Sequence, residues 1–203
     1  MNKVRKGLAL SHVKQADSIR VVSNRIKTYL ESIGIDPHKI TVRPIVVDTE
    51  WIKNAPITVD LRQKYPQFEK IVLMASRLEA EKNIDLAIKA FKEMVNKIPK
   101  AGLIIVGRGS QVSILKSQVS NLKLDSHVIF EDWADKQTLA SYYKTADLFL
   151  NTSLFEGYGM TLVEAKAAGC KVVSTDVGVA REVGVEVVGH DGHDICVKIV
   201  SIL

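Results

Sequence analysis

Short apolar runs alternate with helix-forming segments along most of this chain, and no other feature limits the possible folds as strongly. Four of the runs are apolar on successive residues: KIVLMAS (70–76), GLIIVG (102–107), DLFLNTS (147–153) and CKVVST (170–175). A strand with this pattern is buried on both of its faces, which is typical of a parallel sheet covered by helices. The sequence therefore predicts an α/β fold with a doubly wound, Rossmann-like parallel sheet.

The segments around these runs supply the remaining expected elements. Further strands are expected at 18–23, 39–47 and 127–132, and helices at 24–33, 84–98, 110–121, 136–145 and 160–168. Asn83 is placed to cap the second of these helices and Pro99 to end it. Ligands of such sheets bind beyond the carboxyl ends of the strands, so a functional site is expected in the strand-to-helix turns.

The chain is expected to contain two structural pieces joined by a linker. Residues 49–69 are polar, contain Pro56 and Pro66, and are predicted to connect a β-α-β piece at 1–48 with a main domain at 70–203. With 203 residues, 46% of them hydrophobic, the chain can bury a substantial core without a metal or a disulfide. Its two cysteines are expected to be buried free thiols of a reducing compartment: Cys170 and Cys196.

The net charge of +5 lies wholly in the first quarter of the chain. Residues 1–48 carry nine Lys and Arg against four acids, an excess of five, whereas the other 155 residues hold nineteen of each sign. A solvated basic face is the preferred interpretation, and the same charge permits peripheral contact with a membrane surface. No nucleic-acid partner is expected, because aromatic residues are sparse and no recognition motif is present. Apolar runs are too short to cross a membrane, so we expect a cytoplasmic protein, with any membrane association at the cytoplasmic face.

The first turn that follows a strand, SRLEAEKN (76–83), places two cations where a helix begins. Arg77 comes directly after the strand and Lys82 precedes the helix. The N-terminus of a helix favours anions, and both side chains bind phosphate oxygens. Alternatively, the two cations are surface charges paired with Glu79 and Glu81, and for this turn alone that interpretation is preferred.

The second turn, VGRGSQV (106–112), resembles the start of a dinucleotide-binding fingerprint. Gly107 and Gly109 follow a strand and precede a helix, and Glu131 ends a later strand where a ribose-binding acid would be needed. However, Val112 occupies the third glycine position, which normally allows the helix to pack closely on the strand. The turn is a weak NAD signature, but its glycines allow a ligand to approach the backbone.

The third turn, within NTSLFEGYGMTLVEAKAAGCKVVST (151–175), sets Glu156 before a helix and Glu164 about one turn inside it. Gly157 and Gly159 remove side chains where the helix presents unpaired N–H groups, so a diphosphate or a sugar hydroxyl can reach the backbone. Ionised glutamate only accepts hydrogen bonds, and the hydroxyls of a sugar or a ribose are suitable donors. Taken singly, Glu156 is more simply a helix cap and Glu164 an exposed acid, but the pair with its glycines favours a ligand.

Together, the three turns offer cations for a diphosphate, backbone donors for its oxygens and two carboxylates for hydroxyls. This combination predicts a site for a nucleotide-sugar. The chain has no Asp-x-Asp motif, and Arg77 and Lys82 can neutralise a diphosphate, so no metal is expected. GHDGHD (189–194) also contains histidines and aspartates, but its two glycines predict a flexible turn, not a preformed metal site.

At these motifs the chain resembles the retaining GT-B glycosyltransferases of family 4, the group 1 glycosyltransferases. Residues 16–48 resemble the last β-α-β piece of that family's N-terminal domain. MASRLEAEKNIDLAIKAF (74–91) is similar to its Arg-x4-Lys phosphate clamp, and FEGYGMTLVEAKAAGCKVVSTDVG (155–178) matches its E-x7-E motif. The resemblance implies a GT-B type fold, with a C-terminal donor-binding domain at 70–203 after a remnant of the N-terminal (acceptor) domain at 1–48.

The resemblance also implies roles for individual residues. Arg77 and Lys82 would stabilise the departing nucleoside diphosphate, and Glu156, the third catalytic group, would contact the donor sugar. Glu164 would hold the ribose, and the strand end from Glu131 onward would lie by the base. The substrate-binding residues expected in this way are Gly107, Asp132, Trp133, Gly157, Tyr158, Gly159, Met160, Thr161 and Glu164.

The implied reaction is transfer of a hexosyl group from a nucleoside-diphosphate sugar to a glycan or lipid acceptor with retention, without a metal or other cofactor. Catalysis would rest on electrostatic stabilisation of the leaving group and on positioning. The chain departs from the family where Pro-Asn-Gly-Val-Asp is usual, because it has Pro44-Ile-Val-Val-Asp48. It also holds only the tail of an N-terminal domain and stops before the family's last helices. We therefore expect a fragment, truncated at its C-terminus, that supplies the donor site and turns over little or nothing alone.

Two other classes of function stay open on these residues, a non-catalytic nucleotide-binding module and a GT-B-like sugar-nucleotide epimerase. The spacing of Glu156 and Glu164 favours the transferase over the epimerase. Val112 at the third glycine position disfavours an NAD enzyme.

Overall fold

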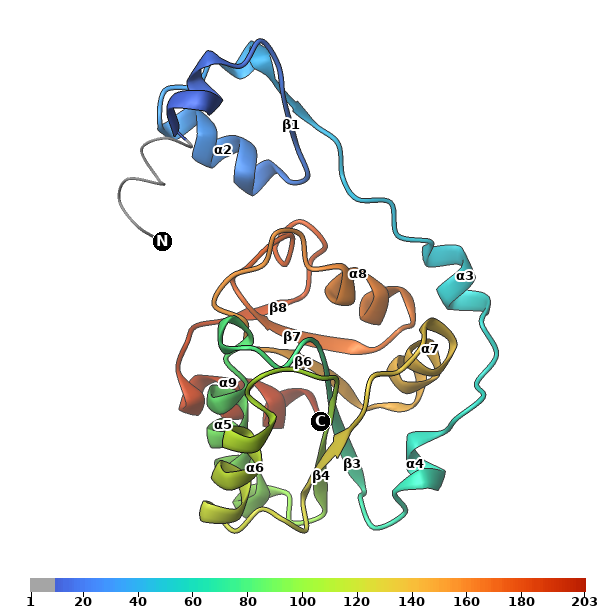
Figure 1. Cartoon of the computed structure of the whole chain (residues 1–203). Coiled ribbons are helices and arrows are strands. Elements are labelled where there is room, and N and C mark those ends of the chain that lie inside the picture. Colours follow the sequence, from blue (N-terminus) through green and yellow to red (C-terminus); the bar gives the residue numbers. More distant parts are fainter. Residues whose placement is uncertain (1–9) are drawn as a thin grey trace. The chain divides into compact units, whose positions relative to one another are not determined.

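The computed structural model describes residues 10–203 (Figure 1). The chain divides into two compact units, one that ends at Val46 and a second that comprises Val47–Leu203. Each unit is described by itself. No helix of the described residues is long and apolar enough to span a membrane.

The first unit contains the predicted β-α-β piece. Strands β1 (Ile19–Val21) and β2 (Ile40–Val42) pair in parallel, and α2 (Asn24–Ser32) connects them through a short 3-10 turn at Pro37–Lys39. The Ser23 hydroxyl caps α2 by accepting a hydrogen bond from the Ile26 N–H at 3.3 Å. A small core holds the unit together, made of Val21, Leu30, Ile35 and Ile40.

The second unit is built on a six-stranded parallel sheet with the strand order β5-β4-β3-β6-β7-β8. The strands are β3 (Lys70–Ala75), β4 (Ala101–Val106), β5 (Val128–Glu131), β6 (Leu148–Asn151), β7 (Lys171–Thr175) and β8 (Glu186–Val188). The apolar residues of the middle strands are all buried, as their consecutive placement predicted. The expected doubly wound Rossmann-like sheet is confirmed.

Helices cover both faces of this sheet (Figure 1). The helices of the first face are α5 (Ile84–Lys97), α6 (Val112–Asn121) and α9 (Gly192–Ile202), and those of the second face are α4 (Leu61–Lys64), α7 (Lys136–Thr145) and α8 (Met160–Ala167). Each set encloses its own apolar cluster with residues of the central strands. Both cysteines are buried and free. The sheet is therefore held rigidly from both sides, which fixes the turns at its carboxyl edge.

The stretch 49–69, predicted to be a linker, includes two short helices of the second unit, α3 (Thr49–Asn54) and α4. Leu61 of α4 is completely buried, and its N–H donates to the Thr145 hydroxyl at 3.1 Å. Pro56 and Pro66 were read as marks of a linker, although the apolar Ile52 and Leu61 of this stretch are buried. The acceptor and donor roles of the pieces stay predictions.

The sequence-based interpretation of 189–194 as a flexible turn was wrong in part, because Gly192 begins α9. The Asp191 carboxylate caps this helix by accepting from the Asp194 N–H at 3.0 Å, and Ile195, Cys196 and Ile199 bury one face. His193 pairs with Glu93 at 3.0 Å. Within residues 10–203, no three His, Cys, Asp or Glu side chains gather in a way that would hold a metal.

Candidate functional site

Two glycine-dependent turns meet at the carboxyl edge of β3 and β4. Gly107 has a φ of 143°, and a Cβ placed on it would lie 1.9 Å from the Ser76 carbonyl oxygen. The Leu78 N–H donates to the Arg108 carbonyl at 2.7 Å, and the Gln111 N–H donates to the Leu78 carbonyl at 3.0 Å. The two turns are thus joined through their backbones, and only glycine permits this approach.

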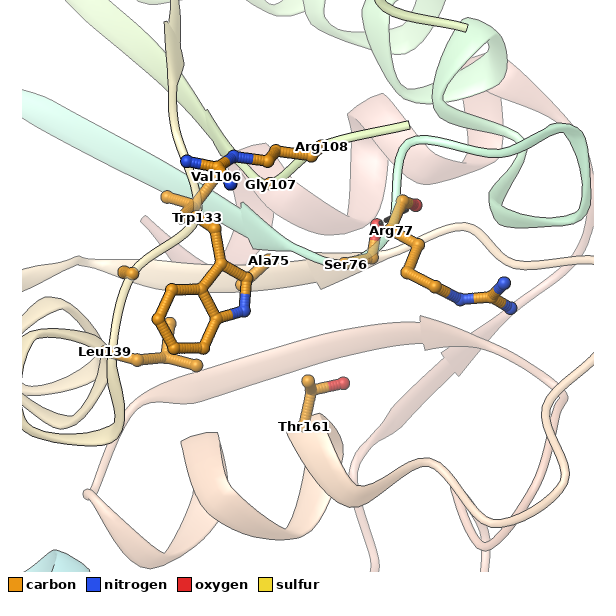
Figure 2. A pocket seen from close by; sticks show the side chains of 10 residues that line it. Ala75, Ser76, Arg77, Val106, Gly107, Arg108, Trp133, Leu139 and Thr161 are labelled. Atoms are coloured by element: carbon orange, nitrogen blue, oxygen red, sulfur yellow. Dashed lines mark hydrogen bonds between the residues drawn. The ribbon is translucent and has the colours of Figure 1, made fainter. Parts of the chain in front are cut away.

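A cavity of about 300 Å³ lies beyond these turns, and we call it the first cavity (Figure 2). Its wall includes Arg77, Gly107 and Arg108 from the two turns, with Trp133 after β5 and Thr161 in the first turn of α8. Figure 2 shows the Trp133 indole and the Thr161 side chain bordering the same space, while Arg77 extends away from the indole. Residues from four strand ends therefore surround one space, as the parallel sheet predicted.

A second cavity, of about 210 Å³, adjoins the first. The two cavities have Trp133, Ala134 and Leu139 in common, so these residues line both. Glu164 lines the second cavity and not the first, together with Lys136 from the start of α7. An elongated ligand that reaches Thr161 and Glu164 would therefore run past Trp133.

Lys82 and Glu156 form a largely buried ion pair between the first and third turns. The Lys82 ammonium lies 2.7 Å from the Glu156 carboxylate, and the two side chains are only 13% and 15% exposed. The Ser153 hydroxyl lies 2.8 Å from the same carboxylate oxygen. The alternative in which Glu156 caps α8 is wrong, because Gly159, with a φ of 92°, takes the N-cap position. The pair sets one cation and one acceptor side by side.

Arg77, in contrast, is a surface charge paired with a neighbouring glutamate, which was the preferred interpretation for its turn alone. It forms an exposed ion pair with Glu81 at 2.7 Å, and its side chain is 72% exposed. Glu79 instead accepts from the backbone N–H and hydroxyl of Ser110 at 2.9 and 2.6 Å, so it supports the second turn. A ligand anion near Arg77 would compete with Glu81 for the guanidinium.

Glu164 is not the exposed helical acid considered as an alternative. It is partly buried one turn inside α8, and its carboxylate accepts a hydrogen bond from the Tyr143 hydroxyl at 3.2 Å. Burial raises the pKa of Glu164, and the Tyr143 hydrogen bond and the Lys136 charge oppose that rise. A partly buried carboxylate that lines a cavity is stabilised when a ligand hydroxyl donates a further hydrogen bond to it.

Asp132 and Trp133 lie at the rim of the site. Asp132 makes a bidentate ion pair with Arg108, whose Nη2–Oδ2 distance is 2.7 Å. Hydrogen bonds from Arg108 and from the Trp133 N–H lower the Asp132 pKa to about 2. Trp133 is 67% exposed, so its indole is available as a flat apolar surface for a base or sugar.

Glu131, which the sequence places where the base was expected, is held by three side-chain donors. Its carboxylate accepts hydrogen bonds from Lys64 at 2.7 Å, from Tyr142 at 2.5 Å and from Tyr65. Burial raises its pKa, but these three donors outweigh burial, and the net shift is downward. Glu131 therefore ties α4 and α7 to β5.

The turn before α8 is fixed by a neighbouring segment. The Tyr158 carbonyl accepts from the Val179 N–H at 2.8 Å, and a Cβ on Gly178 would lie 2.1 Å from that carbonyl oxygen. Gly157 has open space around its Cα, so a ligand can approach there. Four of the expected binding residues form this turn without lining the two cavities: Gly157, Tyr158, Gly159 and Met160.

Sequence reasoning missed several residues that shape the site. Arg108 was treated in the sequence only as part of a glycine turn. No role was assigned there to Lys136, Tyr143 or Ile52. Arg108, between two turn glycines, gave a usable signal, since it follows Gly107 at a strand end. Tyr143 gave none, because its contact with Glu164 spans two helices.

A parallel sheet with glycine turns and paired charges at its carboxyl edge is typical of α/β proteins that bind nucleotides. Residues 60–194 match the family model of glycosyl transferases group 1, and the chain therefore belongs to that family.

Relatives and solved structures agree with this assignment. Phosphatidyl-myo-inositol mannosyltransferase of Mycolicibacterium smegmatis is 32% identical over 174 residues, which cover 85% of this chain and 42% of that protein. Alpha-monoglucosyldiacylglycerol synthase of Streptococcus pneumoniae is 36% identical over 106 residues, 52% of this chain and 24% of that protein. The chain thus matches less than half the length of either relative.

The crystal structure of Anabaena Alr3699/HepE in complex with UDP and glucose has a TM-score of 0.85 to this chain at 21% identity. The likeness covers 99% of this chain and 57% of that one. Sucrose-phosphate synthase from Thermosynechococcus elongatus gives a TM-score of 0.83, also at 21% identity. These likenesses show the GT-B fold.

Proposed function

We propose that this chain supplies the donor site of a retaining glycosyltransferase that moves a hexosyl group from a nucleoside-diphosphate sugar to a glycan or lipid acceptor. The observation that carries the proposal is a set of three groups at the carboxyl edge of the sheet: the Lys82–Glu156 pair, which joins the turns after β3 and β6, and Glu164, which lines the second cavity. Their polar groups suit, in order, a diphosphate, a sugar and a ribose. Two relatives support this class of reaction by their names, alpha-monoglucosyldiacylglycerol synthase and phosphatidyl-myo-inositol mannosyltransferase, which refer to a glucosylated and a mannosylated lipid.

In the proposed complex, the diphosphate lies at the Lys82 ammonium and the N-terminal turn of α8. Glu156, released from part of its contact with Lys82, accepts hydrogen bonds from sugar hydroxyls. As the bond between the sugar carbon and the phosphate oxygen breaks, negative charge grows on the leaving diphosphate. Lys82 and Arg77 stabilise that charge, so that no metal is required. The acceptor hydroxyl oxygen then forms its bond to the sugar carbon on the same face, with retention, and its proton passes to the leaving diphosphate oxygen.

A lipid acceptor would bring the chain to a membrane surface. Residues 1–48 carry an excess of five positive charges. We propose that this charge attracts anionic lipid headgroups when the acceptor is a lipid.

The test is calorimetric titration of the 203-residue chain with UDP, GDP, ADP and NAD, repeated on Glu164→Ala. We expect saturable binding of one diphosphate, weakened roughly tenfold to a hundredfold in the variant, because a charge-assisted hydrogen bond to the ribose is lost. The matched control is Glu69→Ala, which removes an exposed glutamate paired with Lys100 and should leave affinity unchanged. Failure of every diphosphate to bind the folded chain would contradict the proposal.

A further inference from the structure

Tyr143 is a buried phenol whose hydroxyl faces the Glu164 carboxylate. The side chain is 2% exposed, and its ring packs edge-on against Phe149, with centroids 5.3 Å apart and an interplanar angle of 82°. Burial and the nearby carboxylate raise the pKa of Tyr143 well above its ordinary value. The hydroxyl therefore keeps its proton and donates to Glu164 Oε2 at 3.2 Å.

The other charged groups around Glu164 are few, and most are engaged elsewhere. Within α8 itself, Lys166 bonds the Val183 and Gly184 carbonyls, and Lys171 of the adjacent β7 bonds the Ile202 carbonyl. Glu50 and Lys53 of α3 pair with each other at 2.6 Å. β6 contributes no charged residue to this contact.

Two further groups lie close to the Tyr143–Glu164 contact. Burial raises the pKa of the Cys170 thiol to about 12, so Cys170 stays neutral. Lys136, at the first position of α7, lines the cavity with Glu164, and its ammonium lies 3.9 Å from the centroid of the Trp51 ring. The indole keeps this cation at the cavity. Tyr143 and Lys136 are thus the groups that favour the ionised form of Glu164.

We propose that Tyr143, assisted by Lys136, is a positioning residue of the nucleoside site, which keeps the Glu164 carboxylate ionised and facing the second cavity. This inference rests on the proposed function, since it names what holds the residue expected to bind the ribose. Neither residue has to contact the ligand for this role. A phenol fixed in the core fits it, because both its ring and its hydroxyl are already ordered before the ligand arrives.

The role has a definite consequence for the pH dependence of binding. Ribose hydroxyls donate much more strongly to the ionised carboxylate than to the protonated acid, so most of the Glu164 contribution is present above the Glu164 pKa and is lost as the pH falls through it. Burial raises that pKa, and Tyr143 and Lys136 oppose the rise. Removing the Tyr143 hydroxyl therefore makes affinity fall at a higher pH than in the wild type.

The experiment measures the Kd of UDP, GDP and ADP for the 203-residue chain between about pH 5 and 8.5, the range over which a raised carboxyl titrates. The variants are Tyr143→Phe, Lys136→Gln and Glu164→Gln. The matched control is Tyr142→Phe, since Tyr142 is equally buried on the same helix but bonds Glu131. Titration of the diphosphate itself changes the Kd of every variant alike. The pH dependence that remains in Glu164→Gln measures this effect.

We expect Tyr143→Phe to bind the diphosphate roughly tenfold more weakly at the acid end, with a difference that shrinks toward the alkaline end. Lys136→Gln, an exposed substitution that leaves the core intact, should shift the profile in the same direction. The double variant Tyr143→Phe/Glu164→Gln should match Glu164→Gln alone, and Tyr142→Phe should match the wild type.

Two results would overturn the inference without touching the proposed function. One is a wild-type pH profile in both Tyr143→Phe and Lys136→Gln while Glu164→Gln loses affinity. The other is an equal loss at every pH in Tyr143→Phe, which would indicate a packing role. If the wild-type chain binds no diphosphate, both the proposed function and this inference fail. If Tyr143→Phe does not fold, the Lys136→Gln profile decides.

Discussion

Lys82 and Arg77 show how one short motif can contain two different kinds of cation. Both belong to the same turn, yet Lys82 is held in a nearly buried pair with Glu156, whereas Arg77 forms an exposed pair with Glu81. A buried charge depends on its partner because little water is present to replace it. An exposed pair is worth little, since water and salt screen it.

We therefore expect Lys82→Met to lower the free energy of unfolding by about 2 kcal/mol, because Glu156 would be left buried with only Ser153 as a donor. Urea unfolding at neutral pH measures this. In the double variant Lys82→Met/Glu156→Gln most of the loss should be recovered. The control is Arg77→Met, which should change stability by less than about 0.5 kcal/mol. Equal effects of Lys82→Met and Arg77→Met would contradict this reading of the pair.

The strand-to-helix turns owe their shape to close backbone contacts. The turn after β4 lies so near the turn after β3 that a side chain at Gly107 has no room, whereas Gly157 before α8 has open space. In the sequence both residues look alike, since each is a glycine in a strand-to-helix turn. The tertiary contact assigns Gly107 to folding and leaves Gly157 free to admit a ligand.

Gly107→Ala is expected to destabilise the second unit by about 2–4 kcal/mol, because the new Cβ would meet the Ser76 carbonyl and the φ of 143° is unfavourable for alanine. Gly157→Ala should stay within about 1 kcal/mol of the wild type, since no atom lies within 4 Å of its Cβ position. Thermal and urea unfolding of the two variants, side by side, provide the test. A stable Gly107→Ala would show that the two turns are not locked together.

The short helices in 49–69 were not predicted, and the reason is physical. α4 has four residues, too few to show a helical period, and it is stable because Leu61 is buried and Asp60 caps it. Its Lys64 and the following Tyr65 then occupy Glu131. A carboxylate that sequence reasoning placed beside the base is thereby used for packing.

The molecule as a whole divides at residues 46 and 47, and each unit has a core of its own. The two large apolar clusters and the six-stranded sheet all lie in the second unit. We expect a chain of residues 47–203 to unfold in one cooperative transition in urea, because its core is complete without the first unit. Circular dichroism and tryptophan fluorescence should report the same midpoint. Two separate transitions, or an unfolded product, would contradict this.

The sequence by itself predicted five of the six strands of the sheet, all except β8, and the edge at which their following turns meet. Runs such as KIVLMAS and GLIIVG are apolar on consecutive residues, which predicts that both faces of the strand are buried. The turns that follow parallel strands lie at one edge of the sheet. The spacing of Glu156 and Glu164 likewise placed one before a helix and the other inside it, since that depends only on local structure.

Only the tertiary structure decided which distant residues the charged groups of the site contact. Lys82 and Glu156 are 74 residues apart in the chain, Lys64 and Glu131 are 67 apart, and Tyr143 and Glu164 lie on different helices. No local pattern encodes such distances through space, because they depend on strand order and on how helices pack across the sheet. The same packing sets the burial of each carboxylate, and burial decides whether its charge is screened, paired or available to a ligand.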